Sequence, residues 1–314
     1  MLLPILSLLA GFILLMWSAD TFTDNGAKIA RIFNISPLVI GLLIFGFGTS
    51  APEMLVSGLA AYDGHPEMSI GNAFGSNILN IGLVLGVTAI ILPITVEKSV
   101  LKKEWLFLFL STLIVGFLLL DGFLSFTDGL ILISLLTLFL INVFRESKKN
   151  NLTDSDNDSL ENNSQKNGKG RTWLLLIVSL IILVSSARLV VWGGTSLALS
   201  FGVSDLIIGL TVIALGTSLP ELAVSISSAL KKQHQMVIGN IIGSNLFNTL
   251  GVLAIPGLIL PFQIPAEAMS RDYFFMLMFT LLVLILSMRL KISRFGGFIL
   301  LTALTIYLYQ LFWI

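Results

Sequence analysis

The feature that most constrains this chain is an internal repeat with a constant offset of 168 residues. Two blocks recur in order: GTSAPE at 48–53 returns as GTSLPE at 216–221, and GNAFGSNILN at 71–80 returns as GNIIGSNLFN at 239–248. Across the segments that contain them, 46–86 and 214–254, 18 of 41 positions are identical without a gap. The chain therefore consists of two copies of one unit.

Both copies lie in long apolar segments, and the composition says what kind of solvent surrounds them. The 314 residues are 55% hydrophobic and 11% charged, with a mean hydropathy of +0.95, whereas soluble domains carry about 25% charged residues. This predicts a polytopic membrane protein in the lipid bilayer. The absence of cysteine excludes disulfides, thiolate metal sites and cysteine nucleophiles. Equal numbers of basic and acidic residues, 18 each, give no indication of a nucleic-acid partner.

Apolar blocks long enough to cross a bilayer, about 20 residues each, predict ten transmembrane helices. They lie at 2–22, 36–61, 68–93, 104–121, 126–144, 172–200, 204–230, 236–262, 271–289 and 294–313. Five helices per copy is an odd number, so the second copy must enter the membrane from the opposite side. The predicted fold is an all-α membrane protein with two inverted five-helix repeats, at 1–145 and 172–314.

The basic residues predict the orientation, because cytoplasmic loops are enriched in Lys and Arg. The ten-helix arrangement places 16 basic residues on one side, Arg271 on the other, and Arg188 within the sixth helix. This predicts a plasma or inner membrane protein with both termini extracellular and the central linker, 146–171, in the cytoplasm. The linker is predicted to be disordered, because it is rich in Asn, Ser, Asp and Lys. Asp20 and Arg188 occupy equivalent positions, and we favour snorkelling of both toward the interface, with an ion pair between them as the alternative.

The proline of the first motif predicts an interrupted helix. Pro52 has no N–H and its ring crowds the carbonyl four residues back, so the helix should break near Gly48. Pro220 should have the same effect near Gly216. Irregular backbone at membrane depth is tolerated where it lines a cavity or is buried in protein. The motifs therefore predict exposed carbonyl groups that face the interior of the protein.

A glutamate accompanies each predicted break. Glu53 and Glu221 lie one turn after the openings, on the same face as Thr49 and Thr217. A charge within a membrane segment is costly, so it indicates a functional site. Two carboxylates with freed carbonyls and hydroxyls form an all-oxygen cage. This donor set suits a hard cation such as Ca²⁺, which takes six to eight oxygens.

The second motif places polar side chains at four-residue steps, so that they share one stripe of a helix. These residues are Asn72, Ser76 and Asn80 in the first copy and Asn240, Ser244 and Asn248 in the second. Their neutral oxygens could coordinate Na⁺ without adding charge. The glycines at 71, 75, 239 and 243 predict close helix contacts.

Structural roles compete with these functional ones. A proline with nearby glycines is often only a kink, and Ser or Asn often holds membrane helices together by hydrogen bonds. This alternative stays open for Asn72, Asn77, Asn240 and Asn245. It does not account for two buried glutamates, whose charges would be left uncompensated without cations.

Together the motifs resemble the alpha repeats of the calcium/cation antiporter superfamily, the sodium/calcium exchangers. The resemblance covers both G-T-S-x-P-E and both G-S-N-x-x-N blocks. It implies the sodium/calcium exchanger fold, with Ca²⁺ between Glu53, Glu221 and the carbonyls of Thr49 and Thr217. It further implies Na⁺ sites at Ser50, Ser218, Ser76 and Ser244, with carbonyls near Gly46 and Ala214, and maps the last polar position to Asn80 and Asn248. Some family members carry Asp at the second of these, whereas this chain offers two central acids only.

The resulting hypothesis is a secondary antiporter that exchanges Na⁺ for Ca²⁺ by alternating access. A Ca²⁺/H⁺ antiporter that uses the same two glutamates is the alternative. An ion channel is disfavoured because repeats with broken helices favour alternating access. An enzyme is disfavoured because a nucleophile and a base are hard to assemble from these residues. The hypothesis calls for transported Ca²⁺ and Na⁺ but for no cofactor and no obligatory protein partner.

Overall fold

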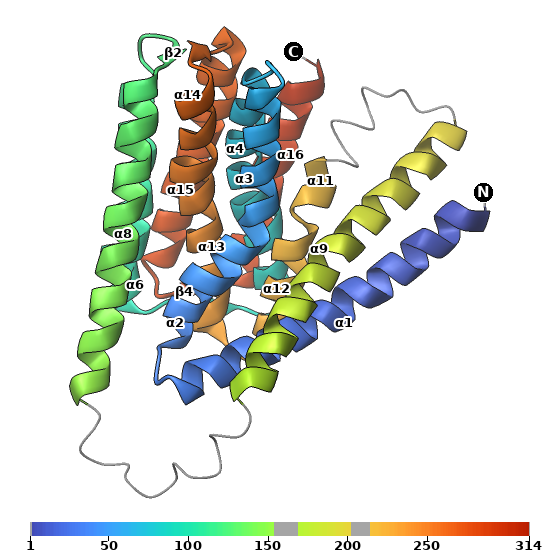
Figure 1. The fold of residues 1–314 in the computed structure, drawn as a ribbon, viewed down its shortest axis with the longest axis vertical. Coiled ribbons are helices and arrows are strands. Elements are labelled where there is room, and N and C mark those ends of the chain that lie inside the picture. The colour runs from blue at the N-terminus through green and yellow to red at the C-terminus, as the bar shows by residue number, and fades with distance from the viewer. Residues whose placement is uncertain (1, 154–168, 202–213, 314) are drawn as a thin grey trace, which may run out of the picture.

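The computed structural model describes residues 2–153, 169–201 and 214–313 (Figure 1). The first half contains α1 (Leu2–Ile32), α2 (Pro37–Ile40), η1 (Gly41–Phe45), α3 (Gly46–Tyr62), α4 (Glu67–Leu79), η2 (Asn80–Leu85), α5 (Gly86–Ile91), β1 (Ile94–Thr95), α6 (Lys98–Val100), η3 (Leu101–Trp105), α7 (Leu106–Leu118), β2 (Phe123–Leu124) and α8 (Phe126–Thr153). The second half contains α9 (Lys169–Ser200), α11 (Ala214–Thr217), α12 (Leu219–Leu230), α13 (His234–Leu246), η6 (Phe247–Val252), α14 (Ala254–Ile259), β3 (Phe262–Gln263), η7 (Ala268–Tyr273), α15 (Phe274–Ser287), β4 (Lys291–Ile292) and α16 (Arg294–Trp313). Segments labelled η are π-helical.

The described part of the chain is almost entirely helical, as predicted, and its helices are apolar enough for a membrane protein. Within the described residues, eight helical runs are long and apolar enough to cross a bilayer. Two predicted spans are not among them. The block at 104–121 forms η3 and α7, and the block at 204–230 is described only from residue 214, where α12 is a short apolar helix. The count of ten therefore stays a prediction.

Two long helices form a separate layer beside the rest of the bundle. In Figure 1, α1 and α9 run side by side along a diagonal, away from the upright helices. Small residues permit this contact. A methyl group at Gly11 would lie 2.7 Å from the Val190 side chain, and one at Gly193 would lie 2.8 Å from the Pro4 carbonyl oxygen. The pair exposes large apolar side chains along much of its length, as a lipid-facing surface would.

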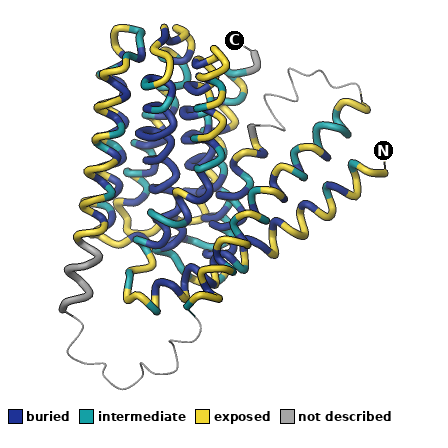
Figure 2. Tube along the Cα trace, viewed as in Figure 1, coloured by how far each residue is buried: buried dark blue, intermediate teal, exposed yellow. Residues whose placement is uncertain are grey.

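The remaining helices enclose the most buried part of the protein. Figure 2 shows burial concentrated along the central helices, whereas α1, α8 and α9 are exposed along one side. In the run His234–Ile259, 89% of the most apolar window is buried, against 28% in Leu2–Ile32. The helices that carry the second motif therefore lie at the centre of the bundle.

Two short antiparallel ribbons show that the repeat extends to the tertiary structure. Strand β1 pairs with β4 through Ile94 and Ile292, and β2 pairs with β3 through Leu124 and Phe262. Adding the offset of 168 to Ile94 and Leu124 gives Phe262 and Ile292. The two ribbons are therefore the same contact made twice, with the halves exchanging roles.

Helical structure also extends into both ends of the predicted linker. Helix α8 continues to Thr153, and α9 begins at Lys169. The remainder of the predicted linker, 154–168, lies outside the described residues.

Candidate cation-binding site

The first motif forms part of a continuous helix. Helix α3 runs through Gly48 and Pro52 without interruption. The break predicted near Gly48 is therefore wrong for this half. Proline in the interior of a helix removes one hydrogen bond and crowds the carbonyl four residues back, and α3 accommodates both effects while its helical backbone continues on either side. The irregularity lies upstream instead, in the π-helical segment η1.

The second copy of the first motif, Gly216–Glu221, is interrupted as predicted. Helix α11 ends at Thr217, Ser218 adopts a turn conformation with φ −89° and ψ 3°, and α12 begins at Leu219. Pro220 occupies the first turn of α12, where its missing N–H is tolerated. The Ser218 hydroxyl is buried and has no hydrogen-bond partner among the described residues. The same six-residue motif therefore adopts two different backbone conformations.

Both glutamates are buried deep in the protein. Glu53 is 3% exposed and Glu221 is 1% exposed. Oε2 of Glu53 and both carboxylate oxygens of Glu221 lack a hydrogen-bond partner within the part of the chain that is described. The two side chains are close enough to interact electrostatically. Two adjacent buried carboxylates with unpartnered oxygens form a site that calls for a compensating cation.

Each glutamate is held by an asparagine from the second motif. Nδ2 of Asn72 donates to the Glu53 carbonyl at 3.1 Å and to Oγ of Ser57 at 2.9 Å. In the second half Nδ2 of Asn240 donates to the Glu221 carbonyl at 3.3 Å and to Oγ of Ser225 at 3.0 Å. These asparagines therefore position the glutamate backbone. The sequence left their role open between packing and coordination.

Asn80 and Asn248 differ from the other asparagines. They are 1% and 0% exposed, and neither amide group has a hydrogen-bond partner for its nitrogen or oxygen among the described residues. By contrast, Asn77 donates to Oγ1 of Thr249 at 2.7 Å, and Asn245 donates to the Ile241 carbonyl at 2.7 Å. A buried amide without partners is costly. In Asn80 and Asn248 the whole amide group is therefore without a partner among the described residues, whereas in Asn77, Asn240 and Asn245 only Oδ1 is.

The predicted hydroxyl groups divide into four environments. Thr49 and Ser244 are buried and 3.3 Å apart, which joins the first motif of one half to the second motif of the other. Ser50 is buried, and its hydroxyl has no partner among the described residues. Ser76 donates to Oδ1 of Asn72 at 3.4 Å. Thr217 differs from its counterpart Thr49, because it is exposed to a cavity.

Glycines let the helices that carry the motifs cross at close range. A methyl group at Gly46 would lie 2.8 Å from the backbone of Gly243, and one at Gly239 would lie 2.8 Å from Cα of Gly41. The prediction of close contacts is therefore confirmed for 239 and 243. At Gly71 and Gly75 it is wrong for the described residues, none of which lies within 4 Å of an added methyl group. Ala214, the counterpart of Gly46, is the first residue of α11, at the edge of the described segment.

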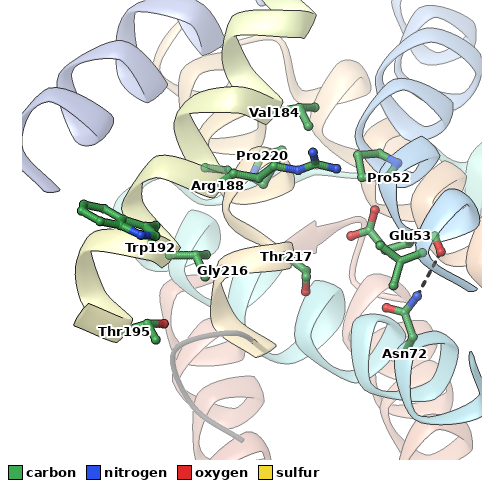
Figure 3. Close-up of a pocket in the computed structure, with 13 residues that line it drawn as sticks. Pro52, Glu53, Asn72, Val184, Arg188, Trp192, Thr195, Gly216, Thr217 and Pro220 are labelled. Carbon is green, nitrogen blue, oxygen red and sulfur yellow. Dashed lines mark hydrogen bonds between the residues drawn. The ribbon is translucent and has the colours of Figure 1, made fainter. Parts of the chain in front are cut away.

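A cavity of about 410 Å³ leads to Glu53 from the space between α9 and the central helices. It is lined by Pro52, Glu53, Val56, Asn72, Val184, Ala187, Arg188, Val191, Trp192, Thr195, Gly216, Thr217 and Pro220. Figure 3 shows the Arg188 guanidinium extending across this space toward Pro52 and Glu53. Arg188, which the sequence suggests to be a snorkelling residue, is exposed and lines this cavity. A lone arginine within an apolar helix was the sequence signal that could have found it.

The described residues contain no cluster of side chains typical of a transition-metal centre. No group of three or more His, Cys, Asp or Glu side chains is placed to hold a metal ion there. Any cation at this site would therefore rely on two carboxylates together with hydroxyl, amide and carbonyl oxygens. Such a set favours hard cations over transition metals.

Comparisons with known proteins agree with this description. The family model described as "Sodium/calcium exchanger protein" matches residues 3–145 and 171–313. The putative antiporter CaxA of Alkalimonas amylolytica is 42% identical, with 99% of each chain covered. The inner membrane protein YrbG of Escherichia coli is 37% identical, over 100% of this chain and 98% of its own. Among solved structures, the sodium-calcium exchanger NCX_Mj, soaked with zero Na⁺ and Ca²⁺, superposes with a TM-score of 0.85 at 37% identity, over 99% of each chain.

Proposed function

This chain belongs to the sodium/calcium exchanger family, and from that premise we propose that it exchanges Na⁺ for Ca²⁺ across the membrane at a site between Glu53 and Glu221. Membership makes it a membrane transporter rather than an enzyme, and the ions that it moves take the place of a cofactor. The observation that carries the proposal is the pair of buried glutamates, three of whose carboxylate oxygens have no hydrogen-bond partner in the described part of the chain.

Exchange follows from competition for the two charges. One Ca²⁺ or two Na⁺ neutralise both carboxylates, so a loaded protein can reorient without a bare charge in a low-dielectric interior. An empty site carries two uncompensated charges, which makes its reorientation slow. This difference couples the two fluxes and suppresses leak. A third Na⁺ held by neutral oxygens would make the exchange electrogenic.

The neutral ligands come from both motifs. We assign Thr49 and Thr217 to the Ca²⁺ position, through their carbonyl groups. Ser50, Ser218, Ser76 and Ser244 would serve the flanking Na⁺ positions, together with the carbonyls of Gly46 and Ala214. The unpartnered amide groups support Asn80 and Asn248 as further ligands.

Alternating access would use the two-layer architecture. The cavity at Glu53 lies between α9 and the central helices, so sliding of α1 and α9 could close it and open the opposite side. We propose that the halves are inverted repeats, with the termini outside and the central linker in the cytoplasm of a plasma or inner membrane. The 16 basic residues on the linker side support this orientation.

The test is ⁴⁵Ca²⁺ uptake into proteoliposomes, with the Na⁺ gradient and the pH gradient varied separately. Internal Na⁺ should drive Ca²⁺ uptake at equal pH, and dissipation of the Na⁺ gradient should stop it. A double variant in which Gln replaces Glu53 and Glu221 is the control for leak. If a pH gradient drives uptake without Na⁺, the protein is a Ca²⁺/H⁺ exchanger instead. If neither gradient drives uptake, the proposal is refuted.

A further inference from the structure

We propose that Arg188 opposes the cation site electrostatically, so that it lowers cation affinity on the cavity side, more strongly for Ca²⁺ than for Na⁺. The inference rests on the proposed function and adds to it a residue that sets specificity and release. It concerns a side chain outside both repeated motifs.

The placement of Arg188 follows from the helix that carries it. Val184, Arg188, Val191 and Thr195 recur at three- and four-residue steps, so one face of α9 lines the cavity. Of the thirteen lining residues, Arg188 is the only basic one and Glu53 the only acidic one. Figure 3 shows the guanidinium reaching from α9 toward the glutamate.

The charge of Arg188 is not cancelled locally. No carboxylate of the described residues lies within the 4.0 Å that defines an ion pair with its guanidinium. Oε2 of Glu53 also has no hydrogen-bond partner there. Arginine stays protonated at all physiological pH values. Arg188 therefore faces the site as a fixed positive charge that does not replace the transported cation as the partner of Glu53.

The walls of the cavity preserve the effect of this charge. Apart from Glu53, Asn72, Arg188, Thr195 and Thr217, the lining consists of aliphatic, glycine, proline and tryptophan residues. Apolar walls confine field lines and weaken the screening of charge by water. A cation that reaches Glu53 through this cavity therefore does so with a like charge on the cavity wall.

The equivalent position of the first half shows that this arrangement is not a general feature of the repeat. There the chain has Asp20, whose carboxylate lies 2.7 Å from Nζ of Lys231. Asp24 lies 2.6 Å from the same ammonium group. Two carboxylates thus share one ammonium group near the first-half position, whereas Arg188 has no carboxylate partner among the described residues. The two halves differ electrostatically at the same position.

The charge of Arg188 should affect Ca²⁺ and Na⁺ by different amounts. A Coulomb energy is proportional to the charge of the ion, so Arg188 repels Ca²⁺ twice as strongly as Na⁺ at one distance. Any factor by which Arg188 weakens Na⁺ binding per ion should therefore appear squared for Ca²⁺. The consequence for transport is easier release of Ca²⁺ into the cavity in exchange for Na⁺.

The experiment is a series of charge variants, R188K, R188Q and R188E, studied in membrane vesicles of defined orientation. The half-saturating concentrations of Ca²⁺ and Na⁺ are measured on the cavity side. R188K should resemble the wild type. R188Q should lower the half-saturating Ca²⁺ concentration about threefold, and R188E about tenfold, because the change in charge doubles. Arg171→Gln, near the other end of the same helix and outside the cavity, is the matched control.

The outcomes separate this inference from the proposed function. If the wild type exchanges Na⁺ for Ca²⁺ but R188Q and R188E leave both affinities unchanged, or weaken them, Arg188 does not oppose the site. Equal shifts for Ca²⁺ and Na⁺ would overturn the electrostatic mechanism, since a steric effect does not depend on valence. Inactivity of R188K with the charge retained would likewise show a purely structural role. Failure of the wild type to exchange would instead refute the proposed function.

Discussion

The two halves carry the same motif, yet one holds it on a continuous helix and the other on a broken one. Thr49 in the first half is completely buried and 3.3 Å from Ser244, whereas its counterpart Thr217 is exposed to the cavity. Gly48 lies inside α3, while Thr217 ends α11 and Ser218 forms a turn. A proline-containing motif therefore permits an interruption of the helix without requiring one.

Packing around the two motifs explains part of this difference. Helix α3 is clamped at Gly46 against the backbone of Gly243, and η1 is clamped at Gly41 against Gly239. These close contacts favour a continuous helix for the first copy of the motif. The second copy of this motif borders the cavity, and its residues Gly216, Thr217 and Pro220 line the cavity wall. The two copies of one motif thus adopt two backbone conformations in the same protein.

The largest effect is expected for Glu53 and Glu221, which occupy equivalent positions in the two halves. Glu53→Gln and Glu221→Gln should each abolish Ca²⁺ transport while the protein stays folded, because one carboxylate cannot neutralise Ca²⁺ and an amide is a poorer ligand. Transport is measured as Na⁺-driven ⁴⁵Ca²⁺ flux, and folding by size-exclusion chromatography in detergent. Near wild-type flux in either variant would show that the site does not need both halves.

A pair of glycine variants tests the asymmetry of packing. An added methyl group at Gly243 would overlap the Leu42 carbonyl oxygen, so G243A should destabilise the protein by about 1–3 kcal/mol. No described residue lies within 4 Å of a methyl group at the equivalent Gly75. There G75A should be neutral or stabilising by up to about 1 kcal/mol, through helix propensity. Melting temperatures in detergent compare the two, and equal losses would show that both halves are packed equally tightly.

A smaller effect is expected from a third acid at the site. Asn248→Asp would add a third carboxylate to the proposed site, about one helical turn from Ser244, and repulsion between like charges would favour uptake of a proton. Exchange by this variant should therefore be inhibited as the pH falls, more strongly than in the wild type. Na⁺-driven Ca²⁺ flux across a pH series measures the difference. Identical profiles would place Asn248 outside the ion site, in a packing role.

The smallest effect is expected outside both halves. Replacing 154–168 with a Gly/Ser segment of equal length should leave transport within about twofold of wild type, since flexible linkers of this composition restrain their ends weakly. The predicted linker contains no apolar segment that could form a core. A matched variant with the residues of 154–168 in scrambled order keeps their composition. Loss of flux in the Gly/Ser variant but not in the scrambled one would assign a role to the charges of the linker.

The sequence by itself determined much of this protein. Its offset of 168 residues established two copies, its apolar runs established a helical membrane protein, and its repeated glutamates located the candidate site. These conclusions were accessible because hydropathy, period and repeated polar residues are local properties of the chain. The prolines predicted the break at Ser218 but also one in α3 that does not exist.

Only the tertiary structure decided which motif is broken, which asparagines are free and where Arg188 points. Asn72, Asn77 and Asn80 are the same residue type on neighbouring turns, yet Asn72 donates to Glu53 and Ser57, Asn77 donates to Thr249 of the other half, and Asn80 has no partner among the described residues. Arg188 faces Glu53 because α9 packs obliquely beside the central helices. Such features depend on which surfaces meet after folding. Whether proline is tolerated inside a helix, or arginine beside a cavity, depends on neighbouring residues that are distant in sequence.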